Sequence, residues 1–142
     1  LARGEAVFES RTDNLLATLE RFTADIGSTS AVIDEQVANH GGDFLDFRAD
    51  DVFYQTKGRL YGYYILLRSL KHDYANIITE RQLDAAWDNM LTSLRAAVML
   101  DPLVITNGAP DSMIRPSHLV SQGFYLLRAR TQMKEISNIL LK

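Results

Sequence analysis

Apolar residues recur at intervals of three and four along most of the chain, which is the pattern of helices that bury one face. The clearest series predicts one long helix over residues 5–39, with Gly27 as a point where it can bend. Such a helix of 35 residues is ~50 Å long. We therefore expect it to extend past the others and to bind a partner, or a second copy, with its exposed end. Its predicted buried stripe is Leu15, Leu19, Phe22, Ile26, Thr29, Ile33 and Val37.

Residues 50–74 are apolar or aromatic on nearly every helical face and contain five of the six tyrosines. A helix that is apolar all round must be covered by other elements, so this segment is predicted to lie at the centre of a helical bundle. Asp50 or Asp51 is expected to cap its N-terminus. Gly58 and Gly62, which share a face, are expected to let another helix approach closely.

Two further helices complete the predicted bundle. Thr79 and Gln82 have the spacing of a capping box, and Ile78 and Leu83 that of a hydrophobic staple, so the third helix is expected to begin at Glu80. Its predicted buried stripe is Leu83, Trp87, Met90, Leu91, Leu94 and Val98.

An irregular segment over residues 103–116 is expected to precede the fourth helix. That helix is predicted from Pro116 or Ser117 to Leu141, with Leu119, Val120, Phe124, Leu127, Met133, Ile136 and Leu140 turned inward. The predicted fold is thus an all-α bundle of four main helices in a single domain, mostly antiparallel, with the first helix the longest.

Composition narrows the functional classes. The chain has 142 residues, of which 46% are hydrophobic and 23% charged, as in an ordinary globular domain. Its net charge of −3 provides no basic field, so nucleic acid is not an expected partner. Without cysteine there can be no disulfide and no thiolate site. The longest apolar run, residues 60–70, is shorter than the ~20 residues that span a bilayer.

The sharpest functional pattern is a polar stripe on the predicted second helix. Three- and four-residue steps place its members on one face: Tyr54, Lys57, Tyr61, Tyr64, Arg68 and His72. One interpretation is a site for a small apolar or anionic ligand, with cations and hydroxyl groups as donors. The other is a boundary face, where tyrosine rings are half inside and their hydroxyls reach water. We favour the second, because a pattern on one helix is weak evidence.

Other polar residues do not form a recognisable catalytic or metal site. The three histidines are isolated in sequence, so neither a metal nor another cofactor is expected: His40, His72 and His118. The acidic residues between 43 and 51 lack the alternation of a calcium loop. Asp84 and Asp88 lie one turn apart and could act as paired carboxylates, but we expect them on the wet side of their helix.

Residues 49–54, continuing through Gly58 to residues 66–68, resemble a family known only as domain of unknown function 2333. The likeness extends to residues 12–15, 104–108 and 117–120. The resemblance implies a longer envelope protein of Gram-negative bacteria, with a membrane-spanning segment near its N-terminus. This chain, which begins at Leu1, would be the C-terminal soluble part, periplasmic and tied to the inner membrane through a segment absent here. The family supplies no catalytic or binding residues to transfer.

Three hypotheses follow. The first is a non-catalytic domain that acts through protein–protein contacts, either with a partner or with itself. The second is a bundle that binds a small apolar or anionic ligand against Tyr61, Tyr64 and Arg68. The third is an enzyme that uses a histidine or the pair Asp84 and Asp88.

Overall fold

The computed structural model describes residues 2–40, 47–101 and 118–142. Within them the chain forms five helices and no strand, which confirms the all-helical prediction. Four helices are long and one is short: α1 (Ala2–His40), α2 (Phe47–Asp73), α3 (Ala75–Glu80), α4 (Asp84–Met99) and α5 (His118–Leu140). The predicted irregular segment, residues 103–116, lies outside the described residues.

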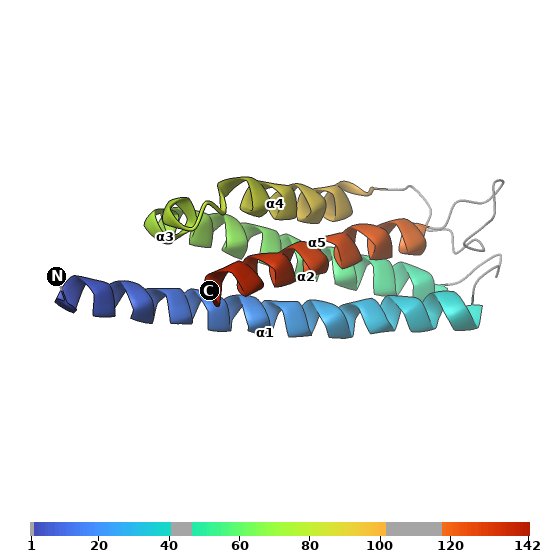
Figure 1. Cartoon of the computed structure of the whole chain (residues 1–142). Coiled ribbons are helices and arrows are strands. Elements are labelled where there is room, and N and C mark those ends of the chain that lie inside the picture. Colours follow the sequence, from blue (N-terminus) through green and yellow to red (C-terminus); the bar gives the residue numbers. More distant parts are fainter. Residues whose placement is uncertain (1, 41–46, 102–117) are drawn as a thin grey trace.

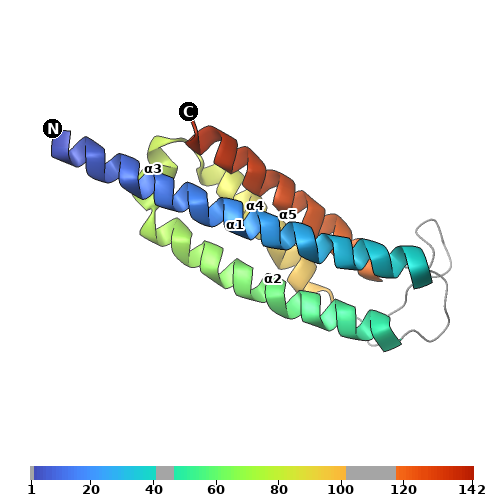
Figure 2. The same ribbon diagram turned by 90° about the horizontal axis from the view of Figure 1, so that it is seen from below.

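The four long helices lie alongside one another, and the chain reverses direction from each to the next (Figure 1). Seen from below, α1 and α2 lie side by side with α5 next to α1 (Figure 2). The most extensive packing is that of α5, against α1 and against α4, whereas α2 packs mainly on α4. The first turns of α1 reach beyond the other helices in both views (Figures 1 and 2).

The predicted stripe of α1 is confirmed. Leu15, Leu19, Ile26 and Ile33 are fully buried, Thr29 is nearly so, and the remaining members pack on the core. Three-and-four spacing succeeds here because α1 has neighbours along one side only, which is the situation that the pattern describes. The helix continues through Gly27 without interruption.

The prediction that the tyrosine-rich helix lies at the centre is wrong. One face of α2 is buried through Phe53, Leu60 and Leu67, while Tyr54 and Tyr61 on other faces are 46% and 55% exposed. Tyrosine tolerates this position because its hydroxyl group can remain in water while part of the ring packs. The helix with the most extensive packing on two sides is α5, which packs against α1 and α4.

Two further predictions for α2 are also wrong, namely the N-cap at Asp50 or Asp51 and the close approach of another helix at Gly58 and Gly62. The helix begins at Phe47, so Asp50 lies in its first turn instead of preceding it. A Cβ atom added at Gly58 or Gly62 would meet nothing within 4 Å. Both glycines are exposed, because their shared face is turned away from the neighbouring helices.

The third long helix begins at Asp84 rather than Glu80, because the predicted capping box is a helix end. The amide of Leu83 donates to the carbonyl of Ile78 (2.8 Å), and that of Gln82 donates to the carbonyl of Thr79 (3.0 Å). Gln82 has a φ of 55°. These are the two hydrogen bonds and the left-handed residue of a Schellman motif, which terminates α3. The predicted stripe of α4 is confirmed, with Leu83, Trp87, Met90 and Leu94 buried and the others partly buried.

The predicted inner face of α5 is partly wrong. Leu119, Met133, Ile136 and Leu140 are buried as expected, but Phe124 and Leu127 are 58% and 53% exposed. The buried stripe passes instead through Gln122, Leu126 and Ala129. Because Gln122 is polar and Ala129 is small, the buried stripe has a weaker apolar pattern than the neighbouring face, which carries Phe124 and Leu127.

Candidate functional site

The residues of the predicted ligand face differ in their surroundings. The ammonium group of Lys57 lies 2.8 Å from the carbonyl oxygen of Leu100 and 2.9 Å from Oδ1 of Asp101. It therefore places a cation at the C-terminal end of α4, where the helix dipole is negative. This contact joins α2 to α4 and gives Lys57 a structural role.

The other members of that face lie at the surface. Tyr61, Arg68 and His72 are exposed, and Tyr64 is partly buried against the core. The imidazole of His72 lies 3.5 Å from the carboxylate of Asp73 and is 92% exposed. A ligand at this face stays a prediction.

The candidate acid–base pair also has ordinary surroundings. Asp84 and Asp88 are exposed, as expected, and Asp88 accepts a hydrogen bond of 2.6 Å from the ammonium group of Lys71. At the start of α5, burial lowers the pKa of His118. Within the described ranges, no group of three His, Asp or Glu side chains could hold a metal ion.

Between α1 and α2, a polar contact is held against an aromatic pair. The hydroxyl of Tyr63 donates to the carboxylate of Asp25, and its ring centre lies 4.9 Å from that of Phe22. Burial, followed by the hydrogen bond to Asp25 and the negative charge of Asp25, together raise the pKa of Tyr63 to about 12. The folded state therefore favours the neutral phenol of Tyr63.

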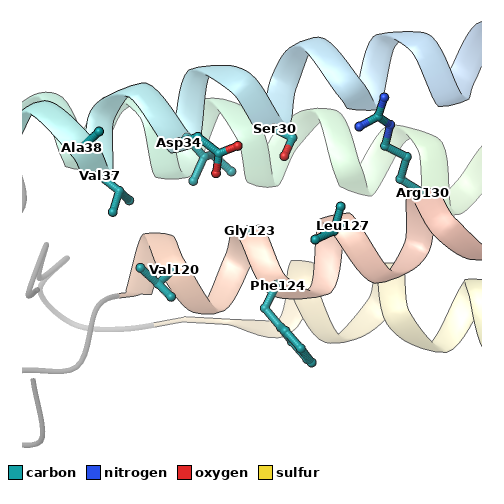
Figure 3. A pocket seen from close by; sticks show the side chains of 10 residues that line it. Ser30, Asp34, Val37, Ala38, Val120, Gly123, Phe124, Leu127 and Arg130 are labelled. Carbon is teal, nitrogen blue, oxygen red and sulfur yellow. The ribbon is translucent and has the colours of Figure 1, made fainter. Parts of the chain in front are cut away.

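The most distinctive hollow is an open groove between α1 and α5, with a volume of about 770 Å³ (Figure 3). Ile33, Val37 and Val120 supply apolar walls, while Phe124 and Leu127 are the exposed apolar residues of α5 described above. Its polar lining residues are Ser30, Asp34 and Arg130. An accessible apolar groove with few polar groups is typical of a binding surface.

Arg130 closes one end of this groove by lying on Gly27 of α1 (Figure 3). A Cβ atom added at Gly27 would lie 2.9 Å from Nη2 and 3.0 Å from Cζ of Arg130. The guanidinium group thus occupies the space that a side chain at position 27 would fill. Its Nε atom is buried and has no hydrogen-bond partner.

A second hollow, of about 420 Å³, lies further along the same two helices, and Arg130 lines it too. Its polar lining comprises Glu20, Thr23, Arg130, Lys134, Ser137 and Asn138. The hydroxyl oxygen of Ser137 is buried there and makes no hydrogen bond. We call this hollow the cleft, to distinguish it from the apolar groove.

Neither hollow was predicted from the sequence. The apolar wall residues Phe124 and Leu127 were assigned to the core, so no groove was expected beside them. Arg130, Lys134, Ser137 and Asn138 occupy three- and four-residue steps on α5, the same kind of signal that singled out the stripe on α2. Their pairing with Gly27 depends on how α1 lies against α5, which periodicity does not reveal.

Together, the fold and these hollows define an all-helical domain with an open groove and no metal cluster within its described part. The chain belongs to the family described as "Uncharacterized protein conserved in bacteria (DUF2333)", which it matches over residues 44–142. This confirms the resemblance seen in the sequence over those residues, whereas its extension to residues 12–15 lies outside the match. A search of curated proteins finds no match, and neither does a search of solved structures. None of the helices described is both long and apolar enough to cross a membrane.

Proposed function

We propose that this chain is a non-catalytic, mostly antiparallel four-helix bundle of a membrane-anchored bacterial envelope protein, acting through protein–protein contacts. The observation that carries the proposal is the apolar groove between α1 and α5, where Phe124 and Leu127 stay exposed. We further propose that a second copy of the chain occupies the groove. The anchor and the periplasmic location rest on the family resemblance.

The charges beside the groove favour a second copy. Asp34 lies on the α1 wall and Arg130 closes the far end, with Leu127 between them along the seam (Figure 3). A two-fold axis near Leu127 would bring Asp34 of each copy toward Arg130 of the other. Such an isologous contact uses one surface patch twice. It would also give the Arg130 guanidinium a carboxylate partner.

The groove wall also has the composition of an interface centre. Phe124 and Leu127 are large apolar groups on a rigid helix, and burying them against another copy would remove them from water. Charged groups lie beside this apolar part rather than within it, which is the usual arrangement of core and rim.

The apolar part of the proposal is tested by measuring the mass of the purified chain across a concentration series, by light scattering and sedimentation. We expect a dimer that Phe124→Ser with Leu127→Ser converts to a monomer of unchanged helicity. The matched control, Val7→Ser with Met99→Ser, removes equally exposed apolar residues elsewhere and should leave the dimer intact. A wild-type chain that stays monomeric at every concentration would refute self-association.

Charge reversal tests the pairing. Asp34→Arg alone and Arg130→Asp alone should each weaken the dimer by about tenfold or more, because like charges then face each other twice. Mixing the two variants restores both opposite-charge contacts, so the mixture should dimerise nearly as well as the wild type. If the mixture is no tighter than either variant alone, the second copy binds elsewhere.

Location requires its own experiment. The full-length protein should fractionate with the inner membrane, and protease added to spheroplasts should digest this domain. Digestion only after the membrane is opened would place the domain on the cytoplasmic side instead. Neither result affects the test of self-association, so the two parts of the proposal can fail separately.

A further inference from the structure

The cleft on the other side of Arg130 contains donor groups that the fold leaves unused. We propose that it binds a phosphate-type oxyanion, either free or carried by a larger molecule. This inference does not require self-association, because it rests on residues that line the cleft, and of these only Arg130 also lines the groove: Arg130, Lys134, Ser137 and Asn138.

The hydroxyl of Ser137 is the first observation. Serine and threonine hydroxyls within helices commonly donate to a carbonyl of the preceding turn. Within the described part of the chain, hydroxyls that donate four residues back include those of Thr12, Thr18, Thr23, Thr29, Thr92, Ser93 and Thr131. Ser137 is only 7% exposed, and its hydroxyl oxygen has no partner. A buried hydroxyl without a bond is uncommon, and an acceptor in the cleft would satisfy it.

The guanidinium of Arg130 is the second observation. It lies against the backbone at Gly27, which fixes its position, yet its Nε is buried without an acceptor. Guanidinium groups bind phosphate oxygens through two parallel hydrogen bonds, for which Nε is one of the donors. The cleft thus offers a positioned cation with a free donor beside a free hydroxyl.

The other residues that line the cleft add further polar and apolar groups around the proposed anion. Lys134 adds a second cation one turn from Arg130, and Asn138 adds an amide one turn further. Thr23, on the opposite wall, already donates to the carbonyl of Leu19, so the donors come from α5. Ala24 and Leu141 supply apolar surface for whatever carries the anion.

Glu20 opposes the two cations and lines the same cleft. It leaves one net positive charge among the three ionised side chains, so binding should be moderate. Neutralising Glu20 should strengthen it. Changes at Glu20 and at Lys134 should therefore have opposite effects on affinity. A general effect of net charge would give the same two signs, so a variant that changes charge outside the cleft is needed as a control.

The experiment titrates inorganic phosphate into the purified chain at constant ionic strength, with chloride as the reference anion, and follows amide chemical shifts of α5. We expect saturable binding that Lys134→Gln and Ser137→Ala each weaken by about fivefold or more, while Glu20→Gln strengthens it about threefold. Arg128→Gln, an exposed arginine on the same helix, is the control for net charge and should change affinity less than twofold. Ser137→Ala should not lower the melting temperature, because the hydroxyl it removes has no partner.

A second arm identifies the carrier with vesicles of neutral phospholipid, with and without an anionic phospholipid. Binding to the anionic vesicles that Ser137→Ala weakens would indicate a lipid headgroup, whereas binding of free phosphate alone would indicate a soluble ligand. The proposal is overturned if phosphate shifts α5 no more than chloride does, or if Ser137→Ala and Arg128→Gln have the same effect.

Discussion

Gln82 shows at the scale of one residue why a helix start was predicted where a helix ends. Both a hydrophobic staple and a Schellman motif place two apolar residues five positions apart, here Ile78 and Leu83. Both residues are buried, so the apolar pair was recognised correctly. What distinguishes the motifs is a left-handed residue at C′, usually glycine, and a glutamine there gives no such signal.

The left-handed angle of Gln82 makes Gln82→Gly a stabilising change. Glycine adopts a φ of 55° without the steric penalty of a side chain, so we expect a gain of about 0.5–1 kcal/mol in the free energy of unfolding. Urea denaturation measures this. Glu80→Gly, two residues earlier and inside α3, should instead lose about 1 kcal/mol. A loss at both positions would contradict the assigned motif.

The glycines of α1 and α2 should respond differently to alanine. Gly58→Ala adds a methyl group in open space on a helix and should gain up to about 1 kcal/mol. Gly27→Ala should gain less, because its methyl group must displace the Arg130 guanidinium. In an Arg130→Ala background the two changes should become equal, which a double-mutant cycle in urea can measure. Equal gains in the native background would argue against the contact.

At the scale of helices, the apolar pattern predicted which segments are helical better than it predicted which faces are buried. It succeeded on α1 and α4, where most of the large apolar residues lie on the buried face. It failed on α2, where aromatic side chains mark several faces, and on α5, where Gln122 and Ala129 belong to the buried stripe. Gln122 is buried because its amide donates to the carbonyl of Phe53 on α2 (3.1 Å), a tertiary contact that sequence spacing cannot show.

The contact between α1 and α2 predicts a pH dependence at the alkaline end. The folded pKa of Tyr63, about 12, lies above the ordinary value of 10.0, so the neutral form is favoured by the fold. Its stabilising contribution is complete below pH 10.0 and is lost as the pH rises toward 12. Tyrosinate absorbance should therefore show a late titration step that Tyr63→Phe abolishes and Tyr61→Phe leaves in place.

Asp25→Asn tests the cause of that shift. Burial, the largest contribution, remains, whereas the carboxylate that accepts the hydrogen bond is removed. The late step should move to lower pH without disappearing, and stability at neutral pH should fall by about 1 kcal/mol. An unchanged step would mean that Asp25 does not contact the phenol in solution.

At the scale of the whole molecule, the helical class and its four long members followed from the sequence, whereas the candidate sites did not. The groove and the cleft exist because α5 lies against α1 in one particular register, with Arg130 opposite Gly27. Register is decided by side chains distributed over both helices, and no local pattern encodes it. On the predicted polar stripe of α2, a shared face in the sequence does not mean shared surroundings, because Lys57 contacts the end of α4 while Arg68 is exposed.

The placement of the two chain ends has a mechanical consequence. The start of α1 and the end of α5 lie in the same half of the molecule, and these two helices run in opposite directions (Figure 1). A pulling force applied between the two chain ends would therefore separate α5 from α1 progressively, breaking a few contacts at a time. If the two chain ends lay at opposite ends of the bundle, the same force would slide the helices past each other and break many contacts at once. We therefore expect this molecule to unfold at a comparatively low force.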